Sequence, residues 1–600
     1  MEELTIRSRS DIPVEDTWAL EDLYATDELW EQELETLKED QAKLAAYEGK
    51  LADSGEMLYT FLLENEQVAA KISDLSHYCM HKYDQDTRDS ASNAMRGRFG
   101  STVTAINAAT SFEMPEIMAI PDEVLEGFYA DCSKLERFRR WLTDSRAARA
   151  HTLSPAEERL LAAAGEMAGT AQSVFGAFNN ADITFPDATD SQGNSHPVTK
   201  GNFIVLQKSP DRELRRSSYE KVYDTIGQFR NTSAAMLNGQ GKRLKFYANA
   251  RKYPSTLDAA LERNQVPTAV YHNLIDTVHE NLPKLHRYMK LRKKLMELDE
   301  LRIYDLYTPI LTDLDQKIPF AQAKQTVYEG LHPLGDDYRA IIKEGFENRW
   351  IDVYENPGKK GGAYSAGARV HPFVLLNYNY GLTGQFTLAH EMGHAAHSYL
   401  SNKTQNPIDA NYVTFVAEVA STCNEALLMD HLLKKTTNKK ERAYLINHFL
   451  EKFRTTLCRQ TMFAEFERFM GDVIAKGGTL TADLLCAEYK RLNEVYYGPD
   501  VVVDDRIALE WARIPHFYYN YYVFQYATGY SAAIALSRQI LEEGAPAVAR
   551  YIKFLSSGCT KPPIELLKDA GVDMTTPQPV NDALAMFDQL LDELEALMED

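Results

Sequence analysis

The stretch LAHEMGHAAHS, from Leu388 to Ser398, places two histidines four residues apart, with a glutamate directly after the first. On an α-helix, positions i and i+4 lie one above the other, so His390 and His394 could bind the same metal ion. Glu391 could then lean over the open side of the metal and act as general base on a bound water. With 15 histidines and 87 acidic residues in 600 positions, chance gives this H-E-x-x-H pattern about 0.05 times per chain. The motif therefore predicts a helix that carries a hydrolytic zinc site.

A catalytic zinc needs a third protein ligand and one open position. The metzincin spacing would put a histidine where this chain has Leu400. Thermolysin-like and aminopeptidase-like spacings would put a glutamate where it has Val413 and Thr414. The first acidic residue that suits a second helix is Glu418, in FVAEVASTCNEAL. We therefore predict one Zn²⁺ per chain, bound by His390, His394 and Glu418.

Two nearby residues have less certain roles. Glu425 lies seven residues after Glu418 on the same predicted helical face. It could accept a hydrogen bond from a ligating imidazole, or it could be a plain structural carboxylate. His397 shares the face of His390 but sits about 10 Å further along the helix axis. Because zinc–nitrogen bonds are about 2 Å long, we expect His397 to pack near the site and not to bind the metal.

The segment RIPHFYYNYYVFQYATGY, from Arg513 to Tyr530, is dense in hydrogen-bond donors. If it is helical after Pro515, then Tyr519, Tyr522 and Tyr526 share one face, with His516 at its start. Such donors could stabilise the oxyanion that forms when an amide carbonyl is attacked. The alternative is an amphipathic helix that buries its tyrosines in the core.

The composition limits the class of protein. The chain is 44% hydrophobic and 25% charged, which is typical of a soluble globular protein. Its net charge of −22 argues against nucleic-acid binding, which needs a basic surface. We find no apolar run long enough for a bilayer and no signal peptide in MEELTIRSRSDIPVEDTW. The six cysteines include no C-x-x-C pair, which favours reduced thiols in the cytoplasm. The sequence does not indicate the oligomeric state.

Helical periodicity fills residues 27–70, 203–250, 266–300 and 440–475. Two stretches interrupt it. Residues 183–203 are turn-rich, with short β-like pieces, and predict a boundary between an N-terminal helical lobe (1–200) and a catalytic domain (201–600). Glycine-rich loops in 349–367 lead into HPFVLLNY, from His371 to Tyr378. We predict a strand there, with a free edge that an extended peptide could pair with.

PFVLLNYNYGLTGQFTLAHEMGHAAHS and FVAEVASTCNEALL together closely resemble the oligoendopeptidase F group of zinc metallopeptidases, relatives of thimet oligopeptidase. IPVEDTWALEDLYATDELWEQEL, RKYPSTLDAALERN and WARIPHFYYNYYVFQYATGY extend the resemblance over essentially the whole chain. It implies a mainly α, two-lobed helical body with a deep internal substrate channel, a small β-sheet beside the H-E-x-x-H helix, and a zinc endopeptidase of short oligopeptides. The residues carried over are the ligands His390, His394 and Glu418, the base Glu391, and the oxyanion donors His516 and Tyr522 or Tyr519.

Two other functions stay open. The same motif and gap resemble peptidyl-dipeptidases of the angiotensin-converting type, which need an anchor for a C-terminal carboxylate that the sequence does not locate. A non-catalytic, zinc-containing peptide-binding protein is the second alternative. Structural zinc sites are usually closed by four ligands and favour cysteine. Cys423 would point away from the ligand face of its helix.

Overall fold

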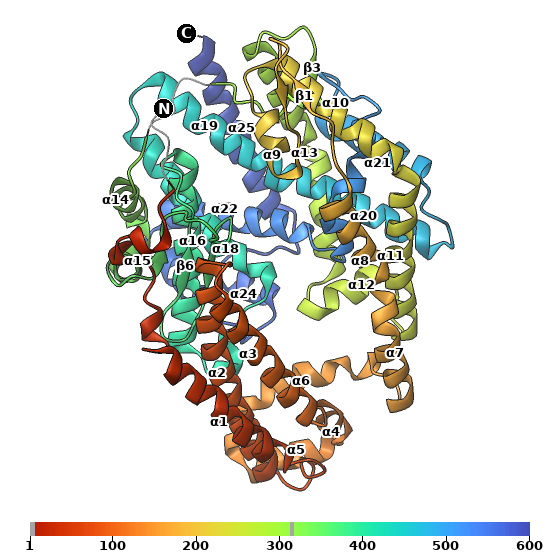
Figure 1. Ribbon diagram of the computed structural model, residues 1–600, viewed down its shortest axis with the longest axis vertical. Coiled ribbons are helices and arrows are strands. Elements are labelled where there is room, and N and C mark those ends of the chain that lie inside the picture. The colour runs from red at the N-terminus through yellow and green to blue at the C-terminus, as the bar shows by residue number, and fades with distance from the viewer. Residues whose placement is uncertain (1–5, 312–316, 600) are drawn as a thin grey trace.

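The computed structural model describes residues 6–311 and 317–599. The chain is mainly α-helical, as predicted, with a few very short strands (Figure 1). The first five residues of the stretch that we searched for a signal peptide lie outside the described residues. Within the described ranges, no helix combines the length and the apolar character needed to cross a bilayer.

The N-terminal helices form the elongated lower part of the molecule in Figure 1. Their termini are capped by side chains, because Thr26, Ser54 and Asp89 accept hydrogen bonds from backbone N–H groups of the first turns. Apolar residues at helical spacing, such as Trp30, Leu34 and Leu37, are buried in a core of their own. The helices are α1 (Asp27–Ala45), α2 (Gly55–Gln85), α3 (Ser90–Ala109), α4 (Glu113–Ala119), α5 (Asp122–Asp131) and α6 (Arg139–Ala147).

The remaining helices surround a second, larger core that starts near Phe175 and extends to Leu594. On one side in Figure 1 lie α7 (Pro155–Ala168), α8 (Thr170–Ala177), α9 (Lys200–Gln207), α10 (Arg212–Gln228), α11 (Arg230–Ala250), α12 (Thr256–Leu261), α13 (Thr268–Leu295), α20 (Arg459–Ala475) and α21 (Ala482–Tyr497). The others are α14 (Phe320–Gly330), α15 (Gly335–Glu347), α16 (Leu382–Thr404), α17 (Pro407–Ala410), α18 (Thr414–Lys435), α19 (Lys439–Lys452), α22 (Phe524–Glu543), α23 (Ala545–Leu555), α24 (Pro563–Asp569) and α25 (Gln578–Glu599).

A three-stranded sheet lies between the two cores. The strands are β4 (Ile351–Asp352), β5 (Tyr364–Ala366) and β6 (Phe373–Leu375), in the order β4-β6-β5. Phe373 and Leu375 belong to the smaller core, whereas Val374 and Leu376 belong to the larger one. Alternate side chains of a strand point to opposite faces. Because both faces of this strand are buried, its sequence is a continuous apolar run, which is why a strand could be predicted at 371–378.

The prediction that this strand has a free edge is wrong. β6 is the central strand, because it pairs in parallel with β4 and antiparallel with β5. Both of its hydrogen-bonding edges are therefore used within the sheet. The edge strands are β4 and β5, and β5 is tied to the N-terminal part through the hydrogen bond from the Tyr364 hydroxyl to Asp84 (2.8 Å).

The other described strands form two smaller sheets of two strands each. The β-like pieces predicted within 183–203 form an antiparallel pair, β1 (Ala188–Thr189) with β2 (Ser195–His196). A second pair, β3 (Leu301–Arg302) with β7 (Val501–Val502), is parallel. Ala188 of β1 already packs in the larger core. The domain boundary at residue 200 stays a prediction.

Three helices build the centre of the larger core: α18 packs against both α16 and α22. Gly393 makes the close approach of α16 to α18 possible. A Cβ atom at this position would lie 2.6 Å from Cα of Ser421 and 2.7 Å from the carbonyl oxygen of Ala420. Because real Cβ atoms do not come this close to backbone atoms, glycine sets the separation of the two helices.

Candidate active site

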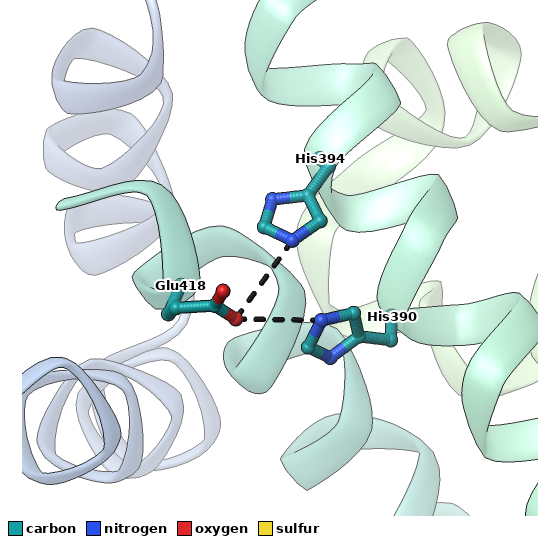
Figure 2. Close-up of side chains that lie close together, drawn as sticks. All are labelled: His390, His394 and Glu418. Atoms are coloured by element: carbon teal, nitrogen blue, oxygen red, sulfur yellow. Dashed lines mark ion pairs between the residues drawn. The ribbon is translucent and has the colours of Figure 1, made fainter. Parts of the chain in front are cut away.

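The side chains of His390 and His394 on α16 converge with that of Glu418 on α18 (Figure 2). Nε2 of His390 lies 3.3 Å from Oε2 of Glu418, and Nε2 of His394 lies 3.8 Å from the same oxygen. The three ligand atoms all lie within 4.8 Å of one another. Among residues 6–311 and 317–599, no other group of three or more His, Cys, Asp or Glu side chains converges in this way.

The donor set fits a catalytic zinc ion. Two imidazoles and one carboxylate are a recurrent ligand set of catalytic zinc sites, which leave a position open for water or substrate. The second nitrogen of His390, Nδ1, donates a hydrogen bond to Oε1 of Glu425 at 2.6 Å. Such a bond fixes the ring orientation and the tautomer in which Nε2 is free to bind a metal.

Glu425 and His397 differ in how they contact the three converging side chains. Glu425 contacts His390 directly, and Nζ of Lys452 on α19 lies 3.2 Å from its other carboxylate oxygen. The ring of His397 instead stacks on that of Tyr412, with centroids 3.7 Å apart and planes inclined by 6°. His397 is not part of the converging ligand group and is a buried packing residue.

The local electrostatics favour ionised carboxylates. Burial raises the pKa of Glu418, but the hydrogen bond and charge of His390, together with smaller contributions from His394 and Ser421, outweigh burial and bring the pKa to about 2. Burial likewise opposes ionisation of Glu425, but Lys452 and His390 lower its pKa to about 2. Burial lowers the pKa of His394 to about 4. Carboxylates that are ionised and a neutral imidazole are the protonation states that metal ligands need.

His390 differs from His394 in its protonation. Burial alone would lower the pKa of His390, but its hydrogen bonds to Glu418 and Glu425 raise that pKa to about 10. A metal ion would therefore have to displace a proton from this imidazole. Metal affinity at such a site increases with pH.

Glu391 combines burial with an unused hydrogen-bonding atom. The residue is 5% exposed, and Oε2 has no partner in the described part of the chain. Burial raises the pKa of Glu391 to about 7, with a smaller opposing contribution from His390. A carboxylate with a pKa near neutrality is suited to accept and return a proton.

The continuous helix after Pro515, on which a shared face of the tyrosines would depend, does not form. A short 3₁₀ helix, η12 (Pro515–Tyr518), is followed by a turn, and α22 starts only at Phe524. Asn520 and Tyr521 in this turn have positive φ angles of 60° and 54°. Left-handed residues cannot continue a right-handed helix, so the shared helical face of the tyrosines does not exist.

The turn nevertheless gathers the predicted donors. The ring centroid of His516 lies 5.6 Å from that of Tyr519, 6.3 Å from that of Tyr522 and 6.1 Å from that of Tyr526. The rings of Tyr522 and Tyr526 lie 5.4 Å apart, edge to face. The cluster is next to the ligand helix, because a Cβ atom at Gly529, one turn after Tyr526, would lie 3.5 Å from Cβ of Glu418.

Three cavities have volumes of about 310, 540 and 730 Å³, and each shares lining residues with the next. Trp141 lines the first and the second cavity. Tyr253 and Arg263 line the second and the third. Val416, two residues before Glu418, lines the second, and Tyr519 lines the third. The second cavity therefore reaches the start of α18 and the third reaches Tyr519, whereas His390, Glu391, His394 and Glu418 line none of the three.

Sequence reasoning missed three residues that shape this site: Lys452, Tyr412 and Gly393. Lys452 and Tyr412 reach the site through tertiary packing, and no motif spacing links them to the histidines. Gly393 carried a signal, because a small residue inside a helix can mark a close helix–helix approach.

Comparisons with known proteins identify the family. The family model described as peptidase family M3 matches residues 205–586, and the one described as oligopeptidase F matches residues 116–185. The chain belongs to peptidase family M3.

Relatives of this M3 peptidase cover nearly its whole length. Oligopeptidase PepF from Bacillus subtilis is 48% identical over 98% of this chain and 88% of its own. The crystal structure of oligoendopeptidase-F from Enterococcus faecium is 36% identical, covers 96% of this chain and 99% of its own, and superposes with a TM-score of 0.75. A solved structure from Chlamydophila abortus is 35% identical, covers 99% of this chain and 100% of its own, and gives a TM-score of 0.92.

Proposed function

We propose that this M3 peptidase is a zinc-dependent endopeptidase that hydrolyses short oligopeptides. The observation that carries the proposal is the convergence of His390, His394 and Glu418 beside a buried Glu391 that has an unpartnered oxygen. The names of the relatives, oligopeptidase and oligoendopeptidase, support peptides as the substrate class. The absence of a disulfide among the six cysteines, all within the described part, supports a reducing compartment such as the cytoplasm.

His390, His394 and Glu418 would hold the zinc ion, and Glu425 would orient His390. When bound, zinc lowers the pKa of a water ligand and polarises the carbonyl of the scissile bond.

The protein side chains would perform the proton transfers. Glu391 would take the proton of the attacking water at its unpartnered oxygen and then deliver it to the leaving amine. His516 is half-buried, and burial lowers its pKa, so it would offer a neutral N–H donor. Together with Tyr522 or Tyr519 it would donate hydrogen bonds to the oxyanion that develops on the substrate carbonyl.

The cavities would hold the substrate chain. They are bordered by α6 of the N-terminal part, by the segment before Glu418, and by Tyr519 of the donor cluster. A peptide that follows them would pass the ligand helix and reach the donors. Folded proteins would be excluded by size.

Glu391→Gln tests the proposal most simply, because glutamine keeps the size of the side chain but cannot accept a proton. We expect the variant to bind zinc like the wild type and to cleave a quenched fluorescent oligopeptide at least about 1,000-fold more slowly. Glu347→Gln, which changes a surface carboxylate of α15, serves as the matched control and should behave as wild type. Retained cleavage by Glu391→Gln would discard the proposed base. Full zinc occupancy of the wild type with no cleavage of a peptide library would favour a binding protein.

A further inference from the structure

The turn between η12 and α22 is held in an unfavourable conformation. Asn520 and Tyr521 are consecutive left-handed residues, and neither is glycine. In this region the Cβ atom of an L-residue approaches the following carbonyl oxygen, so the conformation persists only where surrounding groups impose it. Tyr519 and Tyr522 flank the turn, and both rings pack with His516. Groups that fix the turn therefore also fix the place of these side chains.

Glu467 of α20 holds the turn from its buried side. Oε1 accepts a hydrogen bond from the backbone N–H of Tyr521 at 2.9 Å, and the residue is 5% exposed. No described residue forms an ion pair with Glu467, and Oε2 is without a partner there. Burial raises the pKa of Glu467 to about 8, although the backbone N–H groups of Tyr521 and Val523 lower it. A buried carboxyl group without a counter-charge is costly, and here its hydrogen bond goes to the strained turn.

The side chain of Tyr521 is anchored at a second point. Its hydroxyl lies 2.8 Å from Oγ1 of Thr256, at hydrogen-bonding distance. Gly471 follows Glu467 by one turn of α20 and leaves room for this hydroxyl, because a Cβ atom at Gly471 would collide with it. The same face of α20 thus accepts the backbone N–H of Tyr521 and accommodates its side chain.

A third contact holds the start of the turn. Gln240 of α11, which is 1% exposed, donates a hydrogen bond from Nε2 to the carbonyl oxygen of Tyr518 at 3.1 Å. The ring of Tyr518 stacks on Phe175, with centroids 4.3 Å apart. These contacts place Tyr518 and Tyr521 in the protein interior, while Tyr519 between them is 48% exposed and lines the largest of the three cavities.

We propose that Glu467 is a positioning residue for peptide hydrolysis, because it fixes the Asn520–Tyr521 turn and thereby keeps Tyr519 and Tyr522 beside His516. The inference rests on the proposed function, in which these three residues stabilise the oxyanion. No hydrogen bond or ion pair between described residues joins Glu467 to His390, His394 or Glu418. Its replacement should therefore lower the rate of the chemical step without loss of metal.

Two substitutions of Glu467 separate this role from a general loss of stability. Glutamine can still accept the N–H of Tyr521, whereas leucine has a similar size but no acceptor. We expect Glu467→Leu to lower kcat by about 10- to 100-fold, with zinc content unchanged and KM within about 3-fold of wild type. Glu467→Gln should retain kcat within about 3-fold of wild type.

The results that contradict the inference differ from those that contradict the proposed function. A wild-type enzyme that cleaves peptides, with Glu467→Leu equally active, would refute the role of Glu467 alone. The same holds if Glu467→Gln is as impaired as Glu467→Leu, or if the loss of kcat follows a loss of zinc. A wild-type protein that binds zinc but cleaves no peptide would refute the proposed function, and the inference with it.

A second pair of variants tests the turn without changing Glu467, in case Glu467→Leu does not fold. Gly471→Ala would push a methyl group into the hydroxyl of Tyr521, and we expect kcat to fall by about 10-fold. Adding Tyr521→Phe removes that hydroxyl, and the nearest ring carbon, Cζ, would lie 3.4 Å from the new methyl group. The double variant should regain the kcat of Tyr521→Phe alone. An unaffected Gly471→Ala, or a double variant without recovery, would contradict the inference.

Discussion

Glu425 orients the ring of His390 through the 2.6 Å hydrogen bond to Nδ1. Because outer-shell partners of this kind typically contribute 10- to 100-fold in metal affinity, Glu425→Gln should weaken zinc binding by about 10- to 100-fold. Competition with a chelator of known affinity measures this. Asp430→Asn, further along α18 and paired with Lys434 at 2.8 Å, is the matched control and should leave the affinity unchanged. Equal affinities for both variants would remove Glu425 from the metal site.

The raised pKa of Glu467 should make the stability of the protein depend on pH. Its folded pKa of about 8 lies above the ordinary 4.5, so folding favours the protonated form. The stabilising contribution is complete below about pH 4.5 and is lost as the pH rises through about 8. The free energy of unfolding should therefore fall between pH 5 and pH 8.5 by a few kcal/mol more in the wild type than in Glu467→Gln. Identical pH dependence of the two proteins in urea unfolding would contradict the buried, protonated state.

At the scale of helices, Gly393 sets the distance between α16 and α18, which carry the proposed zinc ligands. Gly393→Ala should separate α16 from α18, weaken zinc binding by at least about 10-fold and destabilise the fold by about 1–3 kcal/mol. Gly97→Ala on α3 is the control, since a Cβ atom there meets nothing within 4 Å. That change should be neutral or stabilising by up to about 1 kcal/mol. Calorimetric zinc titration and thermal unfolding would detect both effects, and wild-type behaviour of Gly393→Ala would contradict this packing.

The helices and the strand at 371–378 could be predicted because their signals are local. The period of the apolar residues indicates the helices, and the run FVLL indicates a strand buried on both faces. The H-E-x-x-H spacing likewise placed His390 and His394 on one helical face, and Glu418 was the first suitable acid on the next helix. Strand order is a non-local property, and so the sequence did not reveal that β6 is the central strand.

The turn within the tyrosine-rich segment could not be predicted from the sequence. Its periodicity suited a helix, but the turn at Asn520 and Tyr521 contains no glycine or proline that would signal an interruption. Contacts with Glu467, Thr256 and Gln240, all distant in sequence, impose that turn. The gathering of His516 with Tyr519 and Tyr522 was thus predicted for a wrong local reason, and tertiary contacts bring the rings together.

At the scale of the whole molecule, segments far apart in the chain line the cavities, among them Trp141, Tyr253 and Val416. We expect a substrate bound in these cavities to be selected by size. A peptide of about ten residues should be cleaved, whereas the same sequence in a loop of a stably folded protein should resist cleavage by at least about 100-fold. Mass spectrometry of the products at matched concentrations measures the ratio. Comparable rates for both substrates would contradict selection by size.

We propose that His390, His394 and Glu418 hold one zinc ion and leave one position free of protein ligands. An anomalous difference map at the zinc edge, from crystals of the zinc-loaded enzyme, would locate that ion. We predict a single peak at about 2.0–2.2 Å from Nε2 of both histidines and from the carboxylate of Glu418, with no fourth side chain. A peak elsewhere, or a fourth protein ligand that closes the site, would contradict the account.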